Sequence, residues 1–134
     1  MASGLTYYSS NAWINHLFRT TKYTAPSTLY AALFTASPSR SGGGTEVTGG
    51  SYQRKPVSVA DASFDAPSNG VSQNAIAVTF DTPTANWGTI VSMALFDASS
   101  GGNMIAFADL TASKTVNLGD GAPSFPIGDF DINL

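Results

Sequence analysis

The chain has 134 residues, a formal net charge of −3 and no cysteine, so we expect one domain, residues 1–134, without disulfides or thiolate metal sites. Only 11% of the residues are charged, against about 25% in an ordinary soluble domain. The six Lys and Arg residues form no basic cluster that would indicate nucleic-acid binding, and no stretch approaches the ~20 apolar residues of a membrane span. A surface with few charges is poorly protected against association, which favours contacts with other subunits. The alternative interpretation of the low charge content is that the chain is a secreted or virion-exterior domain with a neutral polar surface.

Residues 1–24 are predicted to form an N-terminal arm that contains the one helix of the chain. The polar residues 9–11 provide side-chain oxygens that can cap the free amides of a first helical turn. Arg19 and Lys22 follow near the C-terminal end, where the helix dipole favours cations. Four side chains at i, i+4 spacing form one apolar stripe: Trp13, Ile14, Leu17 and Phe18. Because so short a helix is unstable alone, the stripe has to pack against the chain's own sheet or against a neighbouring subunit.

The pattern changes after the arm. In residues 28–36, TLYAALFTA, apolar side chains occur at both odd and even positions, and therefore on both faces of an extended strand. This predicts a strand buried on both faces. Residues 37–51 are predicted to form a long Gly-rich loop, and a loop of about 15 residues in a compact domain is usually functional or mobile. A short strand is predicted at residues 56–60, followed by a second polar connector at residues 61–73.

Short strands then follow one another between turns rich in Gly, Pro and Asn. The sequence SSGGN at residues 99–103 indicates a hairpin connection between two of them. In the last strand Phe130, Ile132 and Leu134 alternate with polar residues, which places one face in the core and the other in water. The predicted strands cover residues 74–80, 89–96, 104–110, 114–118, 124–127 and 129–134. Strands without intervening helices predict an all-β fold, an antiparallel β-sandwich or jelly roll with one short N-terminal helix.

The residue types that carry catalysis are few and scattered, so we expect neither an enzyme nor a bound cofactor. The one histidine, His16, lies inside the predicted helix, and spacing gives it no partner for a triad or a metal site. The one glutamate, Glu46, lies in the Gly-rich loop, whereas glycoside hydrolysis needs two positioned carboxylates. Asp120, or the pair Asp129 and Asp131, could offer oxygen ligands to calcium, but no EF-hand spacing is present, so no metal site is predicted.

Five motifs taken in order carry a family resemblance. They are PSTLYAALFT (residues 26–35), TEVTGGSYQR (45–54), ANWGTI (85–90), ALFDA (94–98) with GGN (101–103), and KTVNLGD (114–120). In this order the chain resembles a family of small bacteriophage virion proteins that are labelled as tail fibre, head fibre or capsid decoration (cement) proteins. The resemblance runs from about Trp13 to Leu134, although residues 61–73 do not match. It implies a β-sandwich that assembles onto the particle as a trimer or another symmetric oligomer, without catalysis.

Three functions are weighed on these grounds. A capsid decoration or cement protein on the outside of the shell comes first, because the chain is compact and lacks a fibrous repeat or long coiled coil. A tail-fibre or tail-tip component that contacts the host surface is the alternative. A carbohydrate-binding module is the third, acting through aromatic side chains: Trp87, Tyr7, Tyr8, Tyr23 and Tyr52. We expect Trp87 to be a core residue instead, at a corner before a buried strand.

The expected partners are the major capsid protein or other virion proteins and further copies of the chain, a trimer being favoured. Neither nucleic acid nor a membrane is expected as a partner. The predicted partner interface combines the helix stripe with charged, aromatic and flexible positions around the Gly-rich loop: Trp13, Ile14, Leu17, Phe18, Arg40, Gly43, Glu46, Tyr52 and Arg54.

Overall fold

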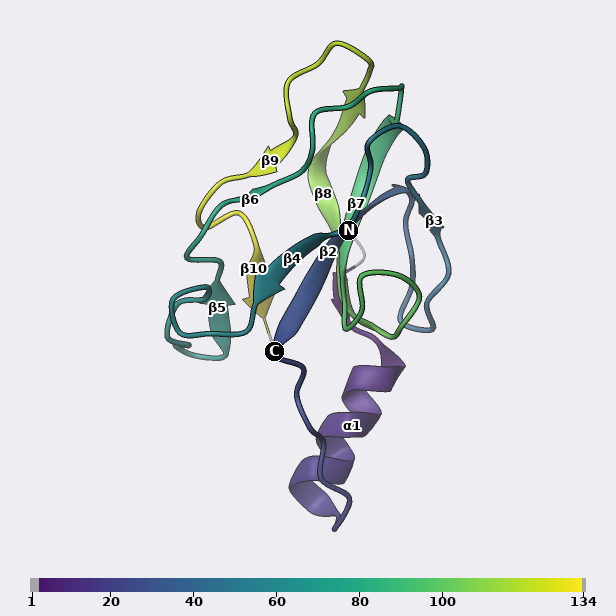
Figure 1. The fold of residues 1–134 in the computed structure, drawn as a ribbon. Coiled ribbons are helices and arrows are strands. Elements are labelled where there is room, and N and C mark those ends of the chain that lie inside the picture. The colour runs from purple at the N-terminus through teal and green to yellow at the C-terminus, as the bar shows by residue number, and fades with distance from the viewer. Residues whose placement is uncertain (1–2, 134) are drawn as a thin grey trace.

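The computed structural model describes residues 3–133 and shows a mainly antiparallel β structure with one short helix (Figure 1). It confirms the all-β class and the N-terminal helix, and its two packed layers are sandwich-like. The elements in chain order are β1 (Ser3–Leu5), α1 (Tyr7–Phe18), β2 (Thr28–Ala36), β3 (Thr45–Glu46), β4 (Lys55–Ser58), β5 (Val71–Gln73), β6 (Val78–Thr79), β7 (Gly88–Phe96), β8 (Met104–Val116), β9 (Ser124–Phe125) and β10 (Asp131–Asn133).

The main sheet has six strands in the order β1-β8-β7-β2-β3, and β4 also pairs with β2. Its centre is the β7–β8 hairpin, whose predicted turn is confirmed. The Asp97 carboxylate closes this turn by accepting hydrogen bonds from the backbone N–H of Asn103 (2.7 Å) and from its side-chain amide (2.9 Å). Short polar side chains of this kind favour turns because they bond locally to the backbone.

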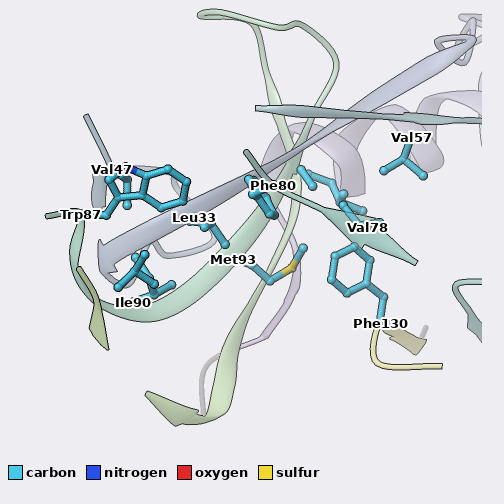
Figure 2. Close-up of a cluster of buried hydrophobic side chains, with 12 residues drawn as sticks. Leu33, Val47, Val57, Val78, Phe80, Trp87, Ile90, Met93 and Phe130 are labelled. Carbon is cyan, nitrogen blue, oxygen red and sulfur yellow. The ribbon is translucent and has the colours of Figure 1, made fainter. Parts of the chain in front are cut away.

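The second layer consists of two small sheets, β10-β5 and β6-β9, that lie over one face of the main sheet. Between the layers lies a core of large apolar side chains (Figure 2). Both layers contribute to it: Leu33, Ile90, Met93 and Leu95 from the main sheet, and Val78, Phe80 and Phe130 from the second layer. Burying each such side chain contributes about 1.5–3 kcal/mol, so this core holds the two layers together.

Strand β2 is buried on both faces, as its continuous apolar run predicts. Ala31 and Leu33 face the large core, whereas Ala32 and Phe34 belong to a second cluster on the other side of the main sheet. The Arg54 guanidinium lies over this second cluster, 3.6 Å from the centre of the Phe96 ring. The middle of β2, residues 31–34, is therefore covered on both faces.

Several predicted strands have different bounds in the structure. Residues 74–80 do not form one strand. The fully buried side chain of Asn74 makes hydrogen bonds to backbone groups where a continuous strand would pair with a neighbouring strand. Its amide donates to the carbonyls of Ile76 (2.7 Å) and Pro126 (2.9 Å), and its oxygen accepts from the N–H of Phe130 (2.8 Å). The chain consequently leaves β5 and starts again as β6.

The strands predicted at residues 104–110 and 114–118 are one strand, β8. The pairing with β7 slips between them, from Asp109 opposite Ser92 to Lys114 opposite Ile90. Extra residues on one strand form a bulge, which bends the strand and increases its twist. Residues 111–113, which lay between the two predicted strands, are in this irregular stretch. In the last strand Phe130 is buried and Ile132 half-buried, as predicted, whereas Leu134 lies outside the described residues.

Candidate assembly surface

The first turn of α1 fixes the helix to the start of β8. Helix α1 begins one turn earlier than predicted, because Thr6 rather than a residue in 9–11 is the N-cap. The Thr6 hydroxyl donates to the carbonyl of Met104 (2.6 Å), and the Ser9 hydroxyl donates to that of Ile105 (2.7 Å). Both side chains are buried. Because these contacts satisfy polar groups away from water, the helix leaves the body in a fixed direction.

The rest of α1 projects from the body, and the chain returns beside it to β2 (Figure 1). From here on the arm means residues 7–27 rather than the predicted 1–24, because Ser3–Leu5 pair with β8 in the main sheet. His16 ties the two halves of the arm together. Its Nδ1 accepts the backbone N–H of Tyr23 (3.2 Å), its carbonyl accepts Lys22 Nζ (2.8 Å), and its ring meets Trp13 edge-on at 6.1 Å. The histidine thus has a structural task within the arm.

The apolar stripe of the arm lies in solvent. Its four side chains have exposed fractions of 47% for Trp13, 53% for Ile14, 61% for Leu17 and 80% for Phe18. With about 150–250 Å² for each large side chain, the stripe exposes an area on the order of 500 Å². The largest apolar patch on a typical monomer is about 300–600 Å² and is often functional. Of the two packing partners expected for the stripe, its own sheet does not cover it.

Arg40 and Gly43 lie in the loop that runs beside the base of the arm. The Arg40 guanidinium donates to the carbonyl of Leu5 (3.2 Å) and the hydroxyl of Ser10 (3.0 Å), and it lies 4.8 Å from the centre of the Tyr7 ring. Arg40 therefore braces the arm against the body. Gly43 is exposed, and a side chain at this position would meet open space.

Glu46, Tyr52 and Arg54 form one cluster inside the chain. Arg54 makes a bidentate ion pair with Glu46, with two contacts of 2.8 Å, and its side chain is only 8% exposed. The Tyr52 hydroxyl donates to Glu46 (3.0 Å) and accepts the backbone N–H of Leu33 (2.9 Å). Burial raises the pKa of this hydroxyl, which stays neutral. These contacts pin residues 45–54 to β2, so residues 37–51 are not a free loop and include strand β3.

The structure therefore separates the predicted interface residues into an exposed group and a cluster that bonds internally. The helix stripe stands out as one exposed surface, with Arg40 at its base. Glu46, Tyr52 and Arg54 meet one another instead of solvent, and their role in partner contacts stays a prediction. Arg54 also donates to the carbonyls of Ala98 (2.9 Å) and Gly101 (2.8 Å) in the β7–β8 turn, a cross-link between distant segments that no local sequence pattern indicates.

Comparison with known protein families matches residues 4–133 to the family described as Podophage GP4 fiber I protein gp80. The match includes the arm, both layers and the strands that carry the motifs. The chain belongs to this family of phage fibre proteins. The resemblance seen in the sequence is thereby confirmed, and the protein is a structural component of a virion. No curated protein matches the chain.

The aromatic side chains of this fibre protein are mostly not placed for stacking on a sugar. Trp87 is buried, as expected of a core residue, and contacts Tyr52 edge-on at 5.4 Å. Its indole Nε1 has no hydrogen-bond partner among residues 3–133. Tyr7 and Tyr8 are exposed, but a platform that also used Trp87 and Tyr52 would need rings that lie inside this fold.

The acidic residues of the fibre protein serve local structure. The carboxylate of Asp120 accepts the backbone N–H of Asn117 (2.8 Å), and that of Asp131 accepts the side-chain amide of Gln73 (2.7 Å). Within residues 3–133, no three His, Asp or Glu side chains gather as a metal site would require. The helix in this part of the chain is not long and apolar enough to cross a membrane.

Proposed function

We propose that this chain is a non-enzymatic subunit of a phage fibre on the exterior of the particle, attached to other virion proteins through its apolar arm. The observation that carries the proposal is the family match over residues 4–133, which covers the arm as well as the body. The exposed stripe supports it, because apolar patches of this size mark interaction sites.

The size of the stripe sets what the arm can contribute. At about 25 cal/mol per Å², burial of ~500 Å² yields on the order of 10 kcal/mol. Association costs an estimated 4–15 kcal/mol in lost freedom of motion, so the stripe alone roughly balances that cost. Stable attachment then requires a partner with a shaped apolar pocket and further contacts around it.

A second candidate is a capsid decoration protein that binds the major capsid protein. It is favoured by the compact body, which has neither a coiled coil nor a fibrous repeat within the described residues 3–133. Such a protein stabilises the shell by mass action, because it binds the assembled shell and not its separated parts.

Copy number separates the two candidates. Quantitative mass spectrometry of purified particles compares this chain with the major capsid protein. A few copies per particle, together with antibody labelling of fibres in electron micrographs, are the expected result. A ratio near that of the capsid protein, with label spread over the shell, would replace the fibre proposal with the decoration role.

A further inference from the structure

The two layers of the body enclose a groove along β8. Its volume is about 680 Å³, and it lies between β1 and β8 on one side and the segment from β9 to β10 on the other. Apolar side chains line it, among them Met93, Leu110 and Phe125 of the core and the half-buried Ile132. The groove follows the irregular stretch of β8, next to the pairing of Ser3–Leu5 with Ala106 to Ala108.

The rim of this groove is acidic. Among the described residues that line it, the charged ones are Asp109, Asp129, Asp131 and Lys114. Asp129 and Asp131 are exposed at the entrance to β10. An apolar groove with such a rim suits an apolar segment that carries cations near its end, because opposite potentials steer and orient partners.

The arm has this composition. Leu17 and Phe18, the two most exposed side chains of the stripe, are followed directly by Arg19, and Lys22 lies in the return segment. Two of the six cations of the chain thus lie beside the apolar tip. The arm and the groove match in polarity and in charge.

The arm is held away from the groove of its own chain. Thr6 and Ser9 fix the start of α1 to β8, and the return segment enters the sheet directly, where the N–H of Val59 bonds to the carbonyl of Ser27 (2.9 Å). The groove that receives this arm therefore belongs to another molecule.

We propose that the arm of one copy docks into the interlayer groove of a second copy, with Arg19 and Lys22 against Asp129 and Asp131. This deepens the proposed function, on which it rests, by naming the partner of the arm. A stable interface buries about 800 Å² on each partner, so the stripe supplies more than half and the base of the arm the remainder. Such a head-to-tail contact closes into a ring when the rotation allows it, which agrees with the symmetric oligomer that we expect.

The absence of cysteine permits a direct test by disulfide cross-linking. Chains with Phe18→Cys are mixed with chains carrying Ile132→Cys in the groove, under mild oxidation. The matched control replaces Ile132→Cys with Thr48→Cys, an exposed position after β3, at the opposite edge of the sheet from β1. The expected product is a disulfide between the first pair, with only background for the control. Dimers of Phe18→Cys alone, equal yields for both pairs, or no cross-link at all would overturn the proposal.

Charge reversal tests the orientation without cysteine chemistry. Arg19→Glu with Lys22→Glu, or Asp129→Lys with Asp131→Lys, should each weaken self-association by about tenfold or more in sedimentation velocity. A mixture of the two reversed chains should recover it, because one arm then meets the other groove with opposite charge. Thermal melts establish that each variant is folded. Failure of the mixture to recover association overturns the assigned orientation.

The two proposals fail separately. If the chain is present in purified particles at a few copies but its arm does not cross-link to the groove, only the self-docking proposal is lost. If the chain is absent from particles, the fibre role fails, whatever the cross-linking shows.

Discussion

The body of this protein buries most of its large apolar side chains, whereas the arm exposes its own. In the body, Leu33 is 2% exposed between two layers, whereas Leu17 on the arm is 61% exposed. Buried polar side chains of the body such as Asn74 and Arg54 are also satisfied internally. Stability therefore resides in the body, and the arm carries a surface whose burial waits for assembly.

The largest expected effect comes from making the same truncation in the two regions. Leu33→Ala removes a fully buried side chain, and such changes cost about 2–5 kcal/mol because a cavity remains. Leu17→Ala, on an exposed helix, should change the free energy of unfolding by no more than about 0.5 kcal/mol. Urea denaturation of both variants measures the difference.

We expect the reverse order for the effect of the two leucine variants on self-association. Leu17→Ala is expected to weaken the oligomer in sedimentation experiments while leaving the fold intact. If Leu17→Ala destabilised the monomer as much as Leu33→Ala does, the division between a stabilising body and an assembling arm would be wrong.

The next largest effect is expected at Asn74. Asn74→Ala leaves the N–H of Phe130 and the carbonyl of Ile76 without the Asn74 amide, whereas the carbonyl of Pro126 keeps the N–H of Asp129 (3.2 Å). A buried polar group left unsatisfied, as the Phe130 N–H would be, costs about 1–3 kcal/mol. The expected result is a large fall in melting temperature with loss of order around β10. Asn11→Ala, on the exposed side of the arm, is the matched control and should leave the melting temperature nearly unchanged. Equal melting temperatures would show that the Asn74 bonds are not needed to hold the second layer.

A smaller effect is expected from two neighbouring glycines with the same backbone conformation. Gly43 and Gly44 have φ of +79° and +81°, so alanine is strained at both, by about 1 kcal/mol or more. A Cβ at Gly44 would also lie 2.7 Å from the carbonyl oxygen of Ala36, whereas at Gly43 it meets open space. Gly44→Ala should therefore have a lower melting temperature than Gly43→Ala. Equal melting temperatures would show that the loop backbone shifts at Gly44 to accommodate the added Cβ.

Much of the fold could be predicted from the sequence because local patterns determine it. The apolar run of β2, the hairpin turn at residues 99–103 and the i, i+4 stripe of α1 each follow from spacing. The break at Asn74 could not be predicted, because its partners, Pro126 and Phe130, lie more than fifty residues away. The joining of the strands predicted at 104–110 and 114–118 could not be predicted for a similar reason, since only pairing with β7 keeps the bulged segment in the sheet.

The candidate assembly surface could be predicted only in part from the sequence. The stripe was visible as a surface that needs a partner, but the sequence left open whether the partner was its own sheet. Glu46, Tyr52 and Arg54 were grouped with it because they lie in one motif, and the structure shows that they bond to each other. The groove along β8 gave no local signal, because it is formed by segments from both ends of the chain.

The smallest expected effect concerns a surface ion pair of the body. Lys55 Nζ lies 2.5 Å from the Asp81 carboxylate, and Gln53 also donates to it (2.7 Å). The hydrogen bond from Lys55, followed by that from Gln53, lowers the pKa of Asp81. Because the folded pKa lies below the unfolded one, the contribution to stability is present above the unfolded pKa and is lost as the pH falls through the folded pKa. Asp81→Asn should therefore lower the melting temperature slightly at neutral pH and not at strongly acidic pH. An identical loss at both would mean that Asp81 acts through packing rather than charge, and the arm, which contains no part of this pair, should self-associate unchanged in either case.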